Sequence, residues 1–380
     1  FLTATGGSFT RASVGTYFDS TGVMQTAASG TPRFDYDPVT HSAKGILIEE
    51  SRTNLAFYSK SPVSWATNSA TVATTGTTEL GMFSSATVSS TGATWNRINM
   101  IRTGGTPWVP VTGPVTMTFY YKAGTSGKVA VTVYDTTSSQ TTQMAGNVGS
   151  LSIISQTAGV ISNLTQKQIG SIYVVSATFT PNSTTDNIAF GIGPNSGVSG
   201  ENIIVLGGQL EYGSFPTSFI PTTNATVTRA IDSLSIPIGA WGDPLKGSFY
   251  VEAPKVLNQG VSSRYYALIN GNAQVSLING ANIGGYVTDS AGTSIASFNS
   301  TALTTGTVFK DGLAYTTNDF AESVNGGTLM TDTTGTMSSL ATLIVGNNSA
   351  AGSRNINGNI SKLKYYPLRL PNSQLQLLTQ

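Results

Sequence analysis

The sequence contains no cysteine and a single histidine, and only 10% of its 380 residues are charged. Disulfide frameworks and zinc or iron–sulfur sites need cysteine or several histidines, so these classes are excluded. The 19 lysines and arginines are balanced by 18 aspartates and glutamates, which excludes the basic surface typical of nucleic-acid-binding proteins. No apolar run approaches the roughly 20 residues of a membrane-spanning helix. We therefore expect no nucleic-acid partner and no membrane insertion.

The residues that are abundant favour β-structure. Hydrophobic residues make up 39% of the chain and aromatic residues 9%, which is typical of a folded chain and not of a disordered one. Threonine, valine, isoleucine, tyrosine and phenylalanine form strand-sized stretches separated by glycine, asparagine, serine and proline. Apolar residues alternate over 115–121 and 129–133, and the turn-rich link 122–128 between them indicates a β-hairpin.

The chain divides near residues 222–243, where Pro221, Pro237 and Pro244 cluster with glycines. Strand-sized segments recur at short intervals on both sides, which favours two β-sandwiches or jelly rolls over a barrel or a propeller. We predict an all-β protein with an extended N-terminal arm over 1–45, a first sandwich over 46–232 and a second over 233–380. Asn372 or Ser373 is expected to cap a short C-terminal helix. Because the chain begins with Phe1 and not with methionine, we expect an N-terminal piece to be missing.

Two motifs resemble a known module. They are PRFDYDPVTHSAKGILIEESRTNLAFYS, residues 32–59, and GGQLEYGSFPTSFIPTTNATVTRAID, residues 207–232. Together they resemble a module of tailed-bacteriophage virion proteins, mostly tail fibres, tail spikes and other tail-associated proteins, in which a carbohydrate-binding-like jelly roll lies between the motifs. Residues 313–327 and 356–379 are similar to the concanavalin/laminin-G-like, lectin-like sandwich that often follows it. The resemblance implies a structural protein on the virion surface, with other virion proteins as partners and a homo-oligomeric, trimeric state.

Five residues in these motifs are interpreted as structural. Glu50 and Arg52 share one face of a strand, so we expect them to form an ion pair. Asn54 follows at the strand end, where an amide side chain often completes backbone hydrogen bonds. Glu211 ends the predicted strand 203–210 and is expected to pair with Arg52 or Arg229, joining the first and last strands of the jelly roll. A ligand-binding role for these residues is the alternative.

The sequence offers few options for catalysis. His41, the only histidine, lies in a turn after Asp37-Pro38, which is a poor place for a catalytic triad. Glu49 and Glu50 are neighbours on a strand and point to opposite faces, so they do not make the carboxylate pair of a glycosidase. We therefore predict that the chain is not an enzyme. Asp35 and Asp37 supply oxygen ligands that suit calcium, but two acids beside a proline are more typical of a turn, so no cofactor is expected apart from this calcium option.

Sugar-binding sites combine flat aromatic rings with polar side chains for the sugar hydroxyls. In the first sandwich the candidates are Trp95, Arg97 and Trp108, and in the second they are Tyr265, Tyr266 and Tyr286. The alternative for each aromatic residue is core packing, because large rings are highly buried on average.

These observations favour a virion protein of a tail fibre or tail-associated component that binds a bacterial surface polysaccharide or host receptor. A capsid decoration or head-fibre protein has the same sequence features and stays open as an alternative. A polysaccharide depolymerase is the enzymatic alternative, which the missing carboxylate pattern disfavours. An adhesin built of the same modules is a further alternative.

Overall fold

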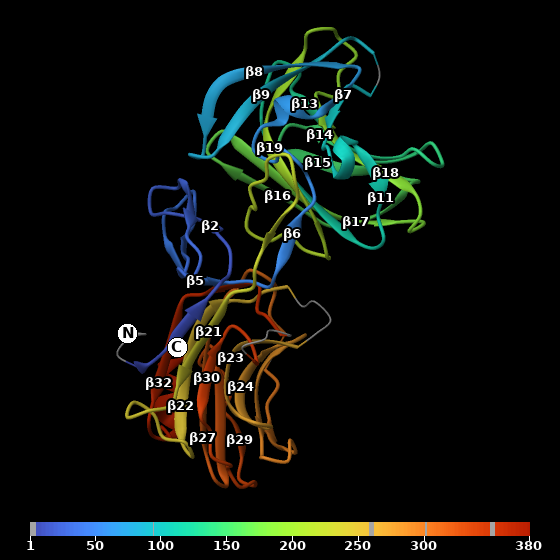
Figure 1. The fold of residues 1–380 in the computed structure, drawn as a ribbon. Coiled ribbons are helices and arrows are strands. Elements are labelled where there is room, and N and C mark those ends of the chain that lie inside the picture. Colours follow the sequence, from blue (N-terminus) through green and yellow to red (C-terminus); the bar gives the residue numbers. More distant parts are fainter. Residues whose placement is uncertain (1–4, 94, 258–261, 301, 350–353) are drawn as a thin grey trace.

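The computed structural model describes residues 5–93, 95–257, 262–300, 302–349 and 354–380, and their regular secondary structure is almost entirely β-strand (Figure 1). The expected all-β class is confirmed, and so is the short C-terminal helix, α2 (Asn372–Leu378), although its N-cap is Pro371 and not Asn372 or Ser373. Two short 3-10 turns, η1 (Pro62–Ser64) and η2 (Thr103–Gly105), lie in loops of the first half. Among the described residues, no helix has the length and apolar character needed to cross a membrane.

The first sandwich packs two sheets around one core. One sheet contains, in spatial order, β15 (Ser150–Gln156), β14 (Gln140–Asn147), β13 (Lys128–Asp135), β18 (Asn187–Gly193), β10 (Arg97–Asn99) and β7 (Ala66–Asn68), with β11 (Trp108–Pro110) also paired to β18. The other contains β16 (Gly159–Ile169), β17 (Ile172–Pro181), β12 (Val115–Lys122), β19 (Asn202–Tyr212), β9 (Phe83–Ser90) and β8 (Ala70–Glu79). Phe119, Val131 and Phe190 are fully buried between them.

The predicted hairpin over residues 115–133 is wrong. β12 pairs with β17 and β19, whereas β13 pairs with β14 and β18, so the two consecutive strands belong to different sheets. Both strands bury a face in the same core, and the link between them crosses from one sheet to the other. Alternation identified the strands but could not identify their partners, because each sheet of a sandwich shows the same period.

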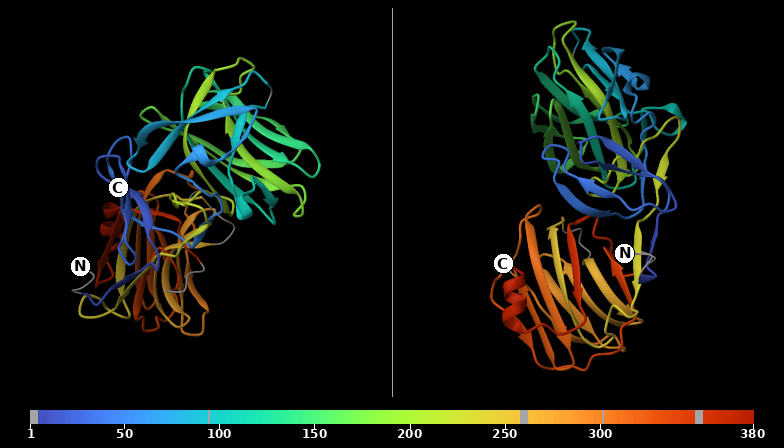
Figure 2. Two further views of the ribbon diagram at one scale, coloured as in Figure 1. Left: turned by 45° about the horizontal axis from the view of Figure 1, so that its top comes forward. Right: turned by 90° about the vertical axis from the view of Figure 1, so that its left-hand side faces the viewer.

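The second sandwich also has two sheets. The larger contains β1 (Ser8–Thr10), β21 (Ser233–Pro237), β30 (Thr342–Val345), β23 (Ser263–Asn270), β24 (Ala273–Asn279), β25 (Ile283–Thr288) and β26 (Ser294–Ser297). The smaller contains β29 (Met330–Asp332), β28 (Asp319–Val324), β27 (Val308–Thr316), β22 (Gly247–Pro254) and β32 (Lys362–Tyr366). Leu375 of α2 packs on Ala314 and Ala321, so the helix covers the outer face of the smaller sheet (Figure 2).

The N-terminal segment lies at the junction of the two sandwiches. It contains β1, the hairpin β2 (Gly15–Phe18) and β3 (Met24–Ala27), and β4 (Phe34–Tyr36). β1 is the edge strand of the second sandwich's larger sheet, where it pairs with β21. β5 (Ala43–Ile48) pairs with β4 on one side and with β31 (Gly358–Ile360) on the other, and β6 (Arg52–Asn54) pairs with β20 (Val227–Arg229). The right-hand view of Figure 2 shows this segment between the two sandwiches, and Met24 of β3 packs with Phe83 and Tyr120 of the first one.

Candidate functional site

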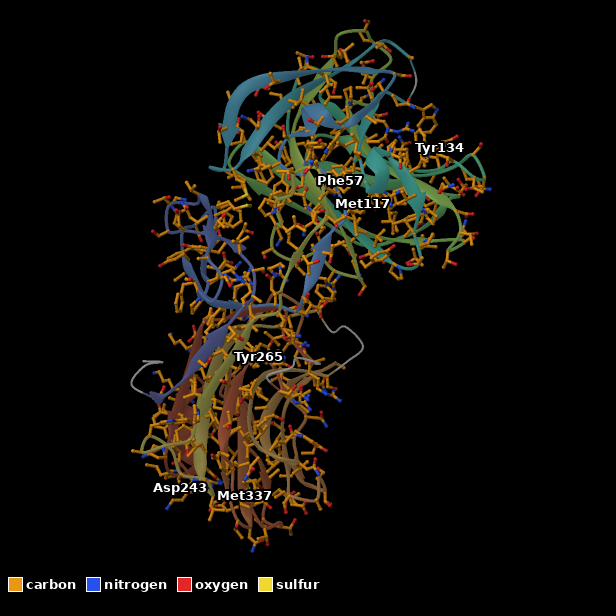
Figure 3. The ribbon with its side chains drawn as sticks, in the orientation of Figure 1. Phe57, Met117, Tyr134, Asp243, Tyr265 and Met337 are labelled. Carbon is orange, nitrogen blue, oxygen red and sulfur yellow. The ribbon has the colours of Figure 1, made fainter. Side chains whose placement is uncertain are left out.

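The outer face of the β13–β18 sheet gathers the aromatic and polar side chains predicted for the first sandwich. On β13, Val131 and Val133 fill the core, so Thr132 and Tyr134 point outward. Tyr134 on β13 and Trp108 on β11 are both paired with the same residue of β18, Ala189, which places the two aromatic residues on one face. Figure 3 shows Tyr134 at the margin of the first sandwich.

A pocket of about 210 Å³ opens beside this face, at the loops before β10 and after β18. Its walls come from Ala93, Trp95, Asn96, Ala130, Thr132, Gln143, Asn195, Ser196 and Gly197. Trp95 is 51% exposed, so its ring is available to a ligand. The Asn96 side-chain amide donates to Ser90 Oγ and to backbone carbonyls, while its buried Oδ1 accepts no hydrogen bond from any described residue. The pocket is smaller than a typical drug-sized site and suits a single sugar unit.

Trp95 has an unusual backbone conformation. Its φ of 64° lies in the left-handed region, which glycine and asparagine adopt readily and which costs other residues roughly 1–3 kcal/mol. A bulky residue at such a position, with half of its side chain in solvent, contributes little to the core. This backbone conformation and the exposure of the side chain leave the Trp95 ring at the wall of the pocket, where it faces solvent.

Arg97 lies flat on the same face. Its Nε donates to Asn99 Oδ1 over 3.1 Å and its Nη1 to the Trp95 carbonyl over 3.2 Å, and the guanidinium lies 5.6 Å from the centre of the Tyr134 ring. Arg97 is 5% exposed, and its burial lowers its pKa, although an arginine stays charged. No carboxylate forms an ion pair with it in the described part of the chain.

The tyrosines predicted for a second sugar site do not form one. Tyr265 and Tyr266 have no exposed surface, so neither ring can stack on a sugar. Tyr265 packs edge-on against Phe309, and Tyr266 stacks on Phe249 with ring centres 4.2 Å apart. A register shift between Arg264 and Tyr266 lets both consecutive rings enter the core. Tyr286 is half-buried on β25, away from the first-sandwich face.

A wider pocket of about 640 Å³ lies at one end of the first sandwich. It is lined by Phe57, Tyr58, Ser64, Ile101, Gly104, Gly105 and Asn224. None of the predicted glycan-binding residues contributes to it, and its polar side chains are limited to three of these seven residues. Trp65 next to it is buried and packs edge-on against Phe119, so it belongs to the core.

The two motifs meet in a buried ion-pair cluster at the junction, formed by Arg11, Arg33, Glu49, Arg229 and Asp232, which we call the junction cluster. Glu49 accepts from Arg33 and from Arg229, each over 2.8 Å, and Asp232 pairs with Arg11 over 3.0 Å and also with Arg33. Burial opposes the ionisation of Glu49, but the charges of Arg229 and Arg33 outweigh it and lower its pKa to about 2. The cluster therefore joins the N-terminal segment to the linkers on either side of the first sandwich.

The other structural residues of the motifs lie close to this cluster. Glu50 and Arg52 form the expected ion pair over 2.6 Å, and Asn54 bonds to the backbone of Ala56, Leu210 and Ile220. Glu211 differs from expectation.

Within the described residues Glu211 has no ion pair with Arg52 or Arg229. It accepts hydrogen bonds from Gln209 and from the backbone and hydroxyl of Thr217 instead. Its burial raises its pKa, against the lowering effect of these hydrogen bonds. Glu211 thus anchors the proline-containing segment 215–221, and Arg229 belongs to the junction cluster.

A pair of acids that the sequence analysis missed is sealed in the second sandwich. Asp311 on β27 and Glu322 on β28 have no exposed surface, and no described cation pairs with either. Burial raises the pKa of Asp311 to about 7 and, together with the Asp311 charge, raises that of Glu322 well above its usual value. Tyr266 and Tyr315 lie beside them in the same core. No polysaccharide can reach this pair in the folded state.

The residues weighed for catalysis or calcium have other contacts. His41 is exposed in a turn where its backbone N–H bonds to the Asp37 carbonyl. Asp35 pairs with Lys44 over 2.7 Å, whereas the Asp37 carboxylate accepts from the backbone of Val39 and Thr40. Within the described residues, no group of three or more metal-ligating side chains gathers.

Comparisons with known proteins add the following. The chain matches no protein-family model and no curated protein sequence. Among solved structures it is similar to the native heptameric SAP-like pentraxin from Limulus polyphemus, with 12% identity over 34% of this chain and 68% of that one and a TM-score of 0.27. It is also similar to the LG4-5 domains of the mouse laminin alpha1 chain, with 11% identity over 86% of this chain and 91% of that one and a TM-score of 0.28. Both are lectin-type or laminin-G β-sandwich structures.

Proposed function

We propose that this chain is a non-catalytic glycan-binding protein of a tailed-bacteriophage virion, part of a tail fibre or another tail-associated structure, which attaches to a bacterial surface polysaccharide. The virion context rests on the resemblance carried by residues 32–59 and 207–232. A place on the capsid, as a decoration protein or head fibre, requires the same binding face and differs only in location. Immunogold labelling of purified particles would separate the two locations.

The observation that carries the proposal is Trp95. Its ring is half-exposed at a polar pocket, and its backbone adopts a conformation that another residue type would adopt at lower cost. Trp108 and Tyr134 lie on the same sheet face and extend the aromatic surface beyond the pocket. A row of aromatic rings beside amide and hydroxyl groups matches the apolar C–H faces and the hydroxyls of successive sugars.

Binding without hydrolysis is supported by the residues of the pocket. Glycoside hydrolysis needs two carboxyl groups about 5–10 Å apart at the scissile bond. None of the nine residues that line the pocket carries a carboxylate. Asp311 and Glu322 are a close acid pair, but both lie inside the second sandwich. Incubation with capsular polysaccharide should therefore release no new reducing ends.

We also propose that the chain acts as a homo-oligomer, a trimer, beside other virion proteins. Ile154 and Val160 are 58% and 55% exposed on the neighbouring edge strands β15 and β16, and open apolar edges of this kind favour association. Light scattering on the purified chain tests the copy number, with a mass three times 39.4 kDa expected.

The binding test uses the full chain and surface polysaccharides purified from a panel of bacteria, with affinity measured by biolayer interferometry. Binding to at least one polysaccharide is expected, and Trp95→Ala should abolish it. Phe34→Ala is the matched control, because Phe34 is a 60% exposed aromatic residue on β4, outside this face. A loss of binding in both variants, or in neither, would count against the proposal.

A further inference from the structure

We propose that the pocket beside Trp95 takes an anionic sugar unit, one that carries a carboxylate such as a uronic or sialic acid, and that Arg97 is its charge partner. This inference rests on the proposed function and specifies the chemical class of the ligand. Arg97 is buried, forms no ion pair with a described residue and lies on β10, beside the strand that carries Gly191.

The charge of Arg97 is not compensated within the described residues. Arg33 and Arg229, which are as buried, each pair with Glu49 at the junction. Arg97 instead bonds only to an amide oxygen and a backbone carbonyl, and its Nη2 makes no hydrogen bond to another described residue. A buried cation without an anion is costly. Arg102 is also buried without an ion pair, but its Nη2 donates to the carbonyls of Val109 and Ile188, whereas Arg97 Nη2 keeps a donor for an anion supplied from outside.

The backbone beneath Arg97 makes room for it. β18 carries Gly191 opposite Asn99, and a Cβ at this glycine would lie 3.0 Å from Arg97 Cδ. The side chain thus crosses β18 at a residue without a side chain and reaches the ring of Tyr134. Gly191 is also in register with Thr132, which lines the pocket. The guanidinium therefore lies between the pocket and the aromatic pair formed by Trp108 and Tyr134.

This placement suits an acidic sugar chain. Arg97 lies beside the pocket without lining it. A sugar unit that stacks on Trp95 and meets the side chains of Gln143 and Asn195 would therefore direct its carboxylate out of the pocket, toward the guanidinium over Tyr134. Arginine favours carboxylates and phosphates alike, so the shared recognition element is an oxyanion. A partly desolvated charge-assisted hydrogen bond corresponds to about 10- to 100-fold in affinity.

The test measures binding of the full chain to hyaluronan, polygalacturonate and polysialic acid oligosaccharides, each beside its carboxyl-reduced counterpart, with sulfated and phosphorylated oligosaccharides as further arms. We expect at least one carboxylated probe to bind about tenfold or more tightly than its reduced form, with an affinity that falls as salt is raised. Equal binding of acidic and reduced probes overturns the inference and leaves the proposed function standing. A preference for the sulfated or phosphorylated probes also overturns the carboxylate assignment. Binding of no sugar, charged or neutral, overturns both.

Variants give a second measurement. Arg97→Gln should bring the ratio of the affinities for the carboxylated and the reduced probe close to one, and Arg97→Lys should keep part of the preference for the carboxylated probe. Arg102→Gln is the matched control, because Arg102 is 2% exposed and lies over Phe190, donating to the carbonyls of Val109 and Ile188. If Arg97→Gln does not fold, the comparison of acidic and reduced probes on the unmodified chain still tests whether the site recognises a carboxylate. An unchanged preference in folded Arg97→Gln contradicts the inference.

Discussion

Arg33 and Asp232 form a fully buried ion pair although 199 residues separate them in the chain. Asp232 also pairs with Arg11 and accepts the backbone N–H of Glu49, so one carboxylate holds three segments together. The motifs that the sequence analysis singled out are therefore the two halves of one joint. Their shared role explains why arginine and acid residues, scarce in the rest of the chain, concentrate there.

Asp232→Asn is expected to destabilise the protein by about 3–5 kcal/mol, because among the described residues it removes the one ion-pair partner of buried Arg11 and leaves buried Arg33 with Glu49 alone. Urea denaturation, monitored by tryptophan fluorescence, measures the free energy of unfolding of the variant. Lys246→Gln is the control, because its ion pair with Asp243 is exposed and spans 3.9 Å; its effect should stay below about 1 kcal/mol. Equal effects of the two changes would contradict a stabilising role for the junction cluster.

Stability at the junction should fall in acid. The pKa of Glu49 is lowered to about 2 in the folded protein, so its contribution to the free energy of unfolding is present above its ordinary value of 4.5 and lost as the pH falls toward 2. The Glu49→Gln variant should have a lower free energy of unfolding at neutral pH and a flatter acid profile. An unchanged acid profile in this variant would show that Glu49 does not cause the effect.

The free energy of unfolding of the second sandwich should change with pH in the opposite direction, falling as the pH rises. The folded protein raises the pKa of Asp311 to about 7 and that of Glu322 further, so both favour the protonated form. Their stabilising contribution is present below the unfolded value near 4 and is lost as the pH rises through 7 and above. The free energy of unfolding of this sandwich should therefore decrease between about pH 4 and pH 7, and continue to decrease above pH 7 as Glu322 ionises. The double variant Asp311→Asn/Glu322→Gln should remove most of that slope, and a slope that persists would assign it to other groups.

Trp95→Asn is expected to leave the melting temperature unchanged or raise it, because asparagine tolerates a φ of 64° better than tryptophan and only half of the tryptophan side chain is buried. Differential scanning calorimetry measures the melting temperature and the binding assay measures the loss of polysaccharide affinity. A large drop in melting temperature would mean that Trp95 is kept for folding, which would remove the main support for the proposed site.

Gly191→Ala should damage both the fold and the binding face. The added Cβ would lie 2.8 Å from the backbone carbonyl oxygen of Ile98 and 3.0 Å from Arg97 Cδ, and the backbone cannot move without disturbing the pairing of β10 with β18. We expect a loss of about 1–3 kcal/mol. Gly113→Ala is the control, since a Cβ there meets no atom within 4 Å. Thermal denaturation of both variants measures the difference between them. Similar melting temperatures for Gly191→Ala and Gly113→Ala would contradict the packing described for Arg97.

Local sequence patterns were enough for features that depend on neighbours in the chain. The ion pair of Glu50 with Arg52 follows from their spacing of two residues, although Glu50 lies between β5 and β6 and not on the expected continuous strand, and the backbone contacts of Asn54 follow from its place at the end of β6. The pairing of Arg33 with Asp232 could not be predicted, because no local pattern reports which distant segments meet. The same limit produced the wrong hairpin over residues 115–133.

The candidate site was predicted in part. Trp95, Arg97 and Trp108 do share one face, but Tyr265 and Tyr266 were wrong for a sugar site, because a register shift turns two consecutive rings inward. Tyr134 was missed even though alternation with Val131 and Val133 places it on the outer face. Thr132 and Gln143 join the pocket only because β13 and β14 pair in this register, which the sequence does not report.

The most direct test of the central claim observes Trp95 itself. The chain has four tryptophans, so fluorine NMR of 5-fluorotryptophan-labelled protein should give one signal for each, with that of Trp95 assigned by its loss in Trp95→Asn. On titration with a bacterial polysaccharide that the protein binds, the Trp95 signal should shift or broaden while that of buried Trp65 stays in place. A polysaccharide that binds and leaves the Trp95 signal unchanged would contradict the assignment of this face as the binding site.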